Sequence, residues 1–193
     1  MDRLHVTTRA AALSIASNTT LILFKLAAGL AIGSVSVIAE AIHSAVDLAA
    51  ALIAFFSVRV AARPADSDHH FGHGKAENIS GTVEGLLIFL GAALVAREAV
   101  LRLWQGPALL EPDLGIAVMA LSVVLNTFVS RYLHRVAKQA DSLALEADAA
   151  HLSTDVWTSL GVFGGLVLVR LTGLAVLDPL LALGVAALIA KAA

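Results

Sequence analysis

Cysteine is absent from the 193 residues, which excludes disulfide bonds and thiolate metal ligands. Without thiolates a soft-metal site for Cu(I) is disfavoured, and only nitrogen and oxygen ligands remain. Charged residues are scarce, at 15% of the chain, where soluble domains have roughly a quarter. The net charge of −2 gives no electrostatic reason to expect a nucleic-acid partner.

Hydrophobic residues make up 59% of the chain, and the mean hydropathy is +0.86, which together indicate a membrane protein. A spanning helix needs about 20 predominantly apolar residues. We therefore predict an all-α membrane protein with a single transport domain over residues 1–193 and six transmembrane helices. The polar start of the chain shows no cleavable signal peptide. The predicted spans are 10–32, 35–60, 78–103, 113–135, 144–170 and 174–191.

Six spans place both chain ends on the same side of the membrane. Nine basic residues fall on that side and three on the other, with Lys25 inside the first span. Because cytoplasmic loops carry an excess of Lys and Arg, both termini are predicted to be cytoplasmic. The nine are Arg3, Arg9, Arg59, Arg63, Lys75, Arg131, Arg135, Lys138 and Lys191, and the three are Arg97, Arg102 and Arg170.

One pattern occurs twice, 108 positions apart, inside long apolar runs. Residues 40–47 and 148–155 each read acid, Ala, any residue, His, three residues, Asp. The second predicted span thus carries His43 and Asp47, and the fifth carries His151 and Asp155. A His and an Asp four residues apart share one face of a helix. Two such pairs facing each other offer two imidazoles and two carboxylates, enough to bind one divalent metal tetrahedrally.

Ionisable side chains at the centre of a bilayer cost about 2.5–3.5 kcal/mol on insertion scales, so these four are expected to face the protein interior. A structural ion pair would explain one His–Asp motif, but two matching motifs favour a metal site. Imidazole nitrogens and carboxylate oxygens suit Zn²⁺. Metal and protons compete for such ligands, because the ligands must be deprotonated to bind metal. This competition is what a metal/proton antiporter requires.

Other polar residues within the spans carry weaker expectations. Glu40 and Asp148 either accept hydrogen bonds from the imidazoles or are solvated at the membrane interfaces, and solvation is favoured. Lys25 and Glu84 are expected to snorkel or to form hydrogen bonds between helices. Asn18 is the polar residue expected to face the cavity.

The polar stretch between the second and third spans holds three of the seven histidines within five residues. Asp66, His69 and His73 are spaced so that they could ligate a second metal, with water or another chain completing the site. A solvated loop that binds metal adventitiously explains the spacing equally well. Both interpretations stay open on spacing alone.

The run Phe71-Gly72-His73-Gly74-Lys75-Ala76-Glu77, together with the His-x-x-x-Asp motifs at 43–47 and 151–155, resembles the cation diffusion facilitator family over essentially the whole chain. The resemblance implies a multi-pass transporter, expected in a bacterial inner membrane, that exports Zn²⁺ or another divalent ion such as Cd²⁺, Co²⁺ or Fe²⁺ in exchange for protons. A set of two His and two Asp is similar to that of the zinc-preferring branch. The implied residues are His43, Asp47, His151 and Asp155 for transport, Asp66, His69 and His73 for a loop site, and Lys75 for salt bridges near a dimer interface.

The chain departs from this family in one respect, because the usual cytoplasmic domain after the sixth span is missing and the sequence stops at Ala193. A naturally short subgroup and a truncated sequence both explain the difference. We expect a homodimer to form through the transmembrane helices in either case.

Two other functions would use the same residues. An intramembrane zinc metallohydrolase would need an open coordination position, which four protein ligands would close, and the sequence contains no His-Glu-x-x-His run. A passive metal channel would use the ligands without coupling to protons. We therefore predict a transporter and no enzyme, with the lipid bilayer and divalent metal ions as its partners.

Overall fold

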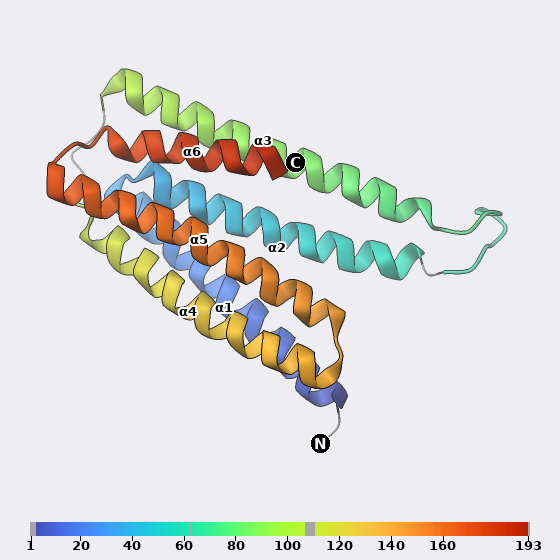
Figure 1. The fold of residues 1–193 in the computed structure, drawn as a ribbon. Helices are drawn as coiled ribbons and strands as arrows, with labels where there is room; N and C mark the ends of the chain where they lie inside the picture. Colours follow the sequence, from blue (N-terminus) through green and yellow to red (C-terminus); the bar gives the residue numbers. More distant parts are fainter. Residues whose placement is uncertain (1–2, 62, 107–110, 193) are drawn as a thin grey trace.

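The computed structural model describes residues 3–61, 63–106 and 111–192, which fold into a bundle of long helices (Figure 1). The side chains of Arg3 and Glu77, both used in the sequence analysis, lie outside this description. The helices of the described part are α1 (Arg3–Ile32), α2 (Val35–Ala61), α3 (Lys75–Gln105), α4 (Asp113–Ala140), α5 (Leu143–Thr172) and α6 (Leu177–Ala192).

The helices agree closely with the predicted spans, and the all-α prediction is confirmed. The first five, α1 to α5, are long and apolar enough to cross a membrane. The sixth, α6, has 16 residues, or about 24 Å at 1.5 Å per residue, which is shorter than the roughly 30 Å hydrocarbon core. A sixth span and the cytoplasmic location of the termini therefore stay predictions.

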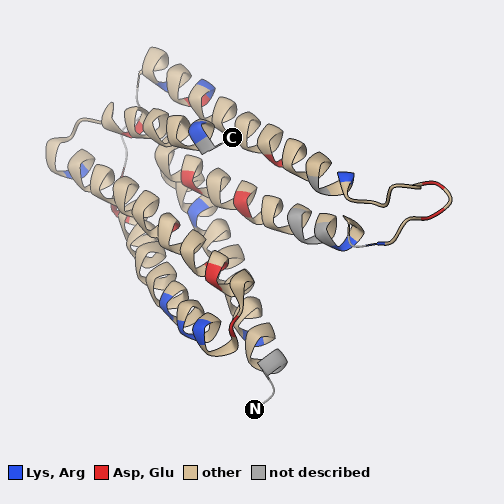
Figure 2. Ribbon diagram, turned by 45° about the vertical axis from the view of Figure 1, so that its right-hand side comes forward, with Lys and Arg blue, Asp and Glu red and all other residues tan. Residues whose placement is uncertain are grey.

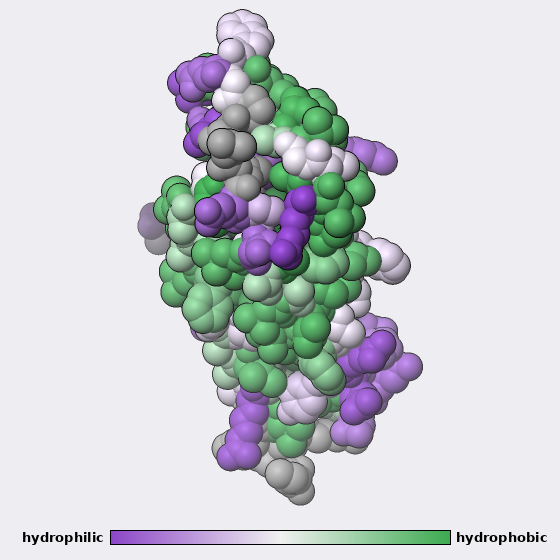
Figure 3. All heavy atoms as spheres, turned by 90° about the vertical axis from the view of Figure 1, so that its left-hand side faces the viewer, coloured by the Kyte–Doolittle hydropathy of each residue, from purple (hydrophilic) through white to green (hydrophobic). Residues whose placement is uncertain are grey.

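Large apolar side chains lie on the outside of the bundle. Phe56, Phe89, Phe128 and Trp157 are each between 60% and 72% exposed. Soluble monomers rarely expose apolar surface on this scale, whereas a bilayer would cover it. Figure 2 shows most Lys, Arg, Asp and Glu residues toward the helix ends and the loops, with few in the helix middles. At the end of the bundle seen in Figure 3, hydrophilic residues form small groups among hydrophobic ones.

The helices pack in two groups, α1 with α4 and α5, and α2 with α3 and α6. They meet where α2 contacts α1 and α5, and Figure 1 shows them diverging from one end of the bundle toward the other. We name the narrow end, with the α1–α2 and α5–α6 connections, the turn end. The opposite end, with the 63–74 loop and the start of α5, is the loop end. The arrangement leaves the space between α2 and α5 widest at the loop end.

A buried carboxylate on α6, that of Asp178, forms hydrogen bonds with the α1–α2 turn. The sequence pattern did not predict this contact. Gly33 adopts a φ of 68°, a left-handed conformation that favours glycine. The Asp178 carboxylate, 2% exposed, accepts hydrogen bonds from Ser34 Oγ at 2.6 Å, from Val35 N at 2.7 Å and from Ser36 Oγ at 2.5 Å. A helix N-terminus favours such an acceptor, because its first N–H groups have no partner within the helix. The start of α2 is thereby held in place.

Candidate metal centre

Three predicted ligands converge where α2 faces α5. The second helix, α2, supplies His43 and Asp47, which are one turn apart on one face, and α5 supplies Asp155. One ligand atom from each residue lies within 4.8 Å of the other two. His43 Nδ1 and Asp47 Oδ2 are 3.3 Å apart. Two helices that are distant in sequence therefore present a nitrogen and two carboxylates to one point.

The ligand atoms of this group have no hydrogen-bond partner among the described residues. His43 Nδ1, Asp47 Oδ2 and both carboxylate oxygens of Asp155 are buried and unpartnered, and Asp155 is 1% exposed. Although His43 Nδ1 and Asp47 Oδ2 are close, their geometry is not that of a hydrogen bond. Buried polar atoms are nearly always paired, because leaving them unpaired is costly. Unpaired nitrogen and oxygen atoms that lie this close together are suited to binding a cation.

His151, the fourth predicted ligand, lies beside this group. Its Nε2 is 3.8 Å from Asp47 Oδ2 and 3.9 Å from Asp155 Oδ2, and its side chain is 42% exposed. It does not belong to the close group of three atoms. Its position is one from which a small side-chain movement would bring a second imidazole onto a bound ion, and its role as a ligand stays a prediction.

A cavity of about 740 Å³ leads to the candidate site from the loop end. Its walls come from the first half of α1, the second half of α2 and the start of α5, and include Asn18, Asp47, Asp148 and His151. The expectation that Asn18 faces the cavity is confirmed. Asp148 is half-buried on the same wall, so its carboxylate lies on the approach to the ligands. The cavity therefore opens the ligand group to one side of the bundle, through a mostly apolar lining that also includes Arg59.

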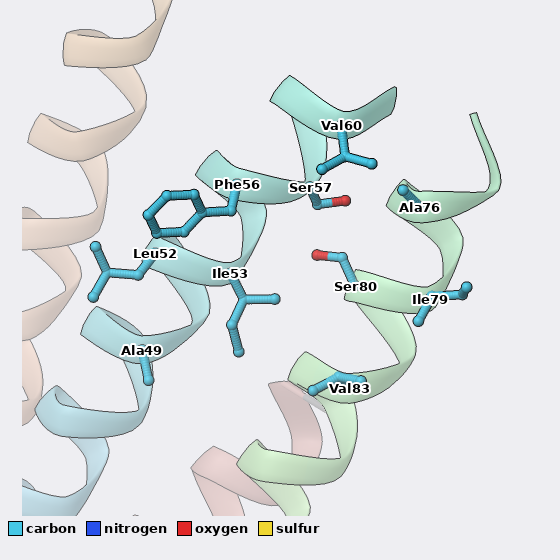
Figure 4. Close-up of a pocket in the computed structure, with 10 residues that line it drawn as sticks. All are labelled: Ala49, Leu52, Ile53, Phe56, Ser57, Val60, Ala76, Ile79, Ser80 and Val83. Atoms are coloured by element: carbon cyan, nitrogen blue, oxygen red, sulfur yellow. The ribbon is translucent and has the colours of Figure 1, made fainter. Parts of the chain in front are cut away.

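A second hollow, a groove of about 650 Å³ between α2 and α3, has a different character (Figure 4). The hydroxyls of Ser57 and Ser80 face each other across it, and the remaining lining side chains are apolar. It offers no imidazole or carboxylate, so it is no route for a cation. Its lining residues are Ala49, Leu52, Ile53, Phe56, Ser57, Val60, Ala76, Ile79, Ser80 and Val83.

The favoured expectation for Glu40 was wrong, whereas Lys25 takes the second of its two expected roles and forms hydrogen bonds between helices. Glu40 is 0% exposed and not solvated at an interface, and Lys25 is 1% exposed and does not snorkel. Their side chains form an ion pair, with 3.5 Å between Lys25 Nζ and Glu40 Oε1. The cause lies in the packing of the helices, because α1 and α2 bring the two opposite charges together and each compensates the desolvation cost of the other. Glu84 accepts a hydrogen bond from Ser80 Oγ at 2.7 Å, and this contact lies within α3 and does not join two helices.

The predicted loop ligands also come together. Asp66, His69 and His73 each place one ligand atom within 4.8 Å of the others, and Asp66 Oδ2 is 3.3 Å from His73 Nε2. Backbone N–H donation by His69 at 2.7 Å, followed by that of Asp68 at 3.0 Å, lowers the pKa of the Asp66 carboxyl below its usual 3.8. The carboxylate is therefore held charged and oriented. Lys75 begins α3 and is exposed.

Known proteins match this chain over nearly its whole length. Residues 11–193 match the family model described as the cation efflux transmembrane domain. The chain belongs to the cation efflux family. An uncharacterized transporter of Synechocystis sp. is 45% identical over 175 residues, which cover 91% of this chain and 56% of the relative. The resemblance to cation diffusion facilitators is thereby confirmed at the level of the family.

Two further relatives are less similar in sequence. The magnetosome protein MamB of Magnetospira sp. is 31% identical over 84% of this chain and 55% of its own length. The cation-efflux pump FieF of Salmonella agona is 31% identical over 79% of this chain and 51% of its own length. The chain spans about half the length of these curated relatives.

Proposed function

We propose that this chain forms the membrane core of an exporter of divalent metal cations, with Zn²⁺ as the favoured cargo and protons as the coupling ion. The observation that carries the proposal is the convergence of His43, Asp47 and Asp155 in the bundle interior, with ligand atoms that have no hydrogen-bond partner among the residues that the structure describes. Membership in the cation efflux family supports the same function, as does the name of a relative, cation-efflux pump.

The donor set favours Zn²⁺ and proton exchange. Imidazole nitrogen and carboxylate oxygen bind Zn²⁺ at about 2.0–2.2 Å, and four-coordinate sites are common. His151 would complete such a site from the cavity wall. Because each ligand must be deprotonated to bind metal, protons that reach the ligands of the occupied site compete with the ion and displace it. Cd²⁺, Co²⁺ and Fe²⁺ accept the same ligands, so the choice among these ions depends on their availability as well as on affinity.

In this proposal the cavity at the loop end admits the ion from the cytoplasm, and the ion leaves at the turn end when the bundle rearranges. The excess of basic residues predicted for the loop end supports this orientation. We also propose a homodimer that forms through the membrane helices, with Lys75 near its interface, in a bacterial inner membrane. The mass of the detergent-solubilised protein, measured by light scattering, tests the dimer.

Transport into proteoliposomes tests the function. A Zn²⁺-sensitive dye inside the vesicles should report accumulation against a Zn²⁺ gradient when a pH gradient is imposed, and a protonophore should abolish the accumulation. Asp47→Asn and Asp155→Asn should each lower the rate at least about tenfold, because removing even an outer partner of a metal ligand costs 10–100-fold. Asp141→Asn is the matched control and should retain transport, because Asp141 is exposed at the end of α4 and Asn tolerates its left-handed backbone.

The other functions make different predictions in the same experiment. A passive metal channel would equilibrate Zn²⁺ without accumulation and would ignore the protonophore. A metallohydrolase would cleave a peptide or lipid without moving Zn²⁺. Normal uphill transport in both Asp47→Asn and Asp155→Asn would contradict the assignment of the site.

A further inference from the structure

A buried ion pair that the proposed transport site does not use lies next to it. Lys25 on α1 and Glu40 on α2 are both 1% exposed at the side chain, with Nζ and Oε1 3.5 Å apart. A charge within a bilayer is rarely kept without a function, because its transfer from water is costly. The pair joins the two groups of helices, since α1 belongs to one and α2 to the other.

Three hydroxyls form hydrogen bonds with this pair, while Glu40 Oε2 is buried without a hydrogen-bond partner among the described residues. Lys25 donates to Ser44 Oγ at 3.2 Å and to Ser159 Oγ at 3.4 Å. Glu40 Oε1 accepts from Thr158 Oγ1 at 2.9 Å and from Ser159 Oγ at 2.8 Å. The three donors of the ammonium are thus all directed to partners, on α2 and α5. We name these five residues the polar layer.

Except for Ser44, which directly follows His43 on α2, the polar layer lies on the turn-end side of the metal centre. On α2, Glu40 precedes His43 by three residues, which is about 4.5 Å along the helix axis toward the turn end. On α5, which runs in the opposite direction, Ser159 follows Asp155 by four residues, about 6 Å toward the same end. The cavity reaches Asp47 and His151 from the loop end. The ligands are therefore open on one side and covered by the polar layer on the other.

We propose that the polar layer is the closed gate on the turn-end side of the transport site, and that the Lys25–Glu40 pair must separate for the ion to leave. The inference rests on the transport site proposed above. A buried ion pair suits a gate, because its Coulombic attraction and its desolvation penalty nearly cancel. Water that enters between the two charges solvates both, so the open state is accessible. An apolar layer of the same volume would gain nothing from water and would stay shut.

Single and double substitutions should change the opening of the polar layer in opposite directions. Glu40→Gln leaves the Lys25 ammonium buried without a counter-charge, which should draw in water and open the layer. Lys25→Met combined with Glu40→Met removes both charges and replaces them with apolar volume, which should hold the layer closed. Thr158→Val, which removes one hydroxyl donor and no charge, should open it slightly and is the mild variant if Glu40→Gln folds poorly.

Because the chain has no cysteine, one introduced thiol can report on the gate. Val162 is 1% exposed and lies on α5 seven residues after Asp155, on the same helix face. In metal-free proteoliposomes, a membrane-impermeant thiol reagent is added to each side, and labelling of Val162→Cys is followed in time. Labelling from the turn end should be roughly tenfold faster with Glu40→Gln and no faster than in the parent with the double Met variant. The double variant should also bind Zn²⁺ within about threefold of the parent yet lose transport, because the site is intact and the exit is shut.

Ala99→Cys is the control for general unfolding, because Ala99 is 0% exposed on α3 in the same apolar cluster as Val162. It should stay unlabelled in every variant. Equal labelling of Val162→Cys in the parent, Glu40→Gln and Thr158→Val would overturn the gate, as would normal transport by the double Met variant. The labelling is measured without metal, so it tests the gate independently of the cargo. If the variants change the labelling but the parent moves no Zn²⁺, the gate proposal is supported and Zn²⁺ transport is contradicted.

Discussion

Asp155 offers the sharpest test of the candidate metal centre, because its two carboxylate oxygens are buried without a hydrogen-bond partner in the part of the chain that the structure describes. In Asp155→Asn the shape is kept and the charge is removed. The metal-free protein should be no less stable than the parent, since the variant no longer buries an unpaired carboxylate. Stabilisation by Zn²⁺ should nevertheless be almost lost. The two effects differ in direction, which a simple loss of packing would not produce.

The magnitude follows from binding linkage. At a Zn²⁺ concentration 100 times Kd, the folded parent gains about 2.7 kcal/mol. Loss of a direct ligand should weaken binding by at least about 100-fold, since loss of an outer partner alone costs 10–100-fold. At the same Zn²⁺ concentration the variant then gains about 0.4 kcal/mol. At roughly 2–4 °C per kcal/mol for a chain of this size, the Zn²⁺-induced rise in Tm falls from about 5–11 °C to about 1 °C.

The assay is thermal unfolding of the detergent-solubilised protein, followed by circular dichroism with and without Zn²⁺. All variants carry Asp66→Asn, which removes the loop carboxylate charge while its amide oxygen still accepts the backbone hydrogen bonds of the turn. Asp148→Asn is the matched control, because Asp148 lines the cavity outside the ligand group. An equal Zn²⁺-induced rise in Tm for Asp155→Asn and Asp148→Asn would refute the reasoning.

Three further predictions concern other parts of the molecule. Asp178→Ala should lower the free energy of unfolding by about 2–3 kcal/mol in thermal melts, because several buried donors lose a charged acceptor; an effect below about 0.5 kcal/mol would argue against this role. His151→Ala should weaken Zn²⁺ binding in calorimetry about tenfold and His43→Ala about 100-fold, since His151 is more exposed and farther from Asp47; the reverse order would contradict the geometry. Because the Asp66 pKa lies below 3.8, its charge stabilises the loop above that value and is lost only as pH falls through the lowered pKa; the ¹³C resonance of the Asp66 carboxyl carbon should therefore show the protonation of this carboxylate only below pH 3.8, and protonation above that pH would contradict the assignment.

The helices could be predicted because their cause is local. A bilayer requires long apolar runs whose backbone hydrogen bonds are satisfied internally, so the runs themselves indicate α1 to α5. The His-x-x-x-Asp spacing likewise places His43 and Asp47 on one face without any knowledge of the partner helix. The length of α6 was overestimated, because residues 174–176 are apolar but precede the helix.

The polar layer and the Asp178 contact could not be predicted in the same way. Lys25 and Glu40 are 15 residues apart and lie on different helices, so no local pattern pairs them. Each residue taken alone is best explained by solvation or snorkelling, because an isolated buried charge is unstable. Asp178 meets residues 34–36 only when α6 packs beside the start of α2. Only Glu40 carried a sequence signal. It lies three residues before His43 and seven before Asp47, and therefore on the same face of α2 as these predicted ligands.

The sequence by itself determined the class of protein, the helical segments and the two His–Asp pairs that are predicted to bind metal, because these depend on hydropathy, helical period and ligand chemistry along one segment. Only the tertiary structure decided that Asp155 joins His43 and Asp47 while His151 lies at the cavity wall. It also decided that the site is reached from the loop end and covered at the turn end by a buried ion pair. Distances between helices and the pairing of buried charges depend on how the segments pack, and no single segment contains that information.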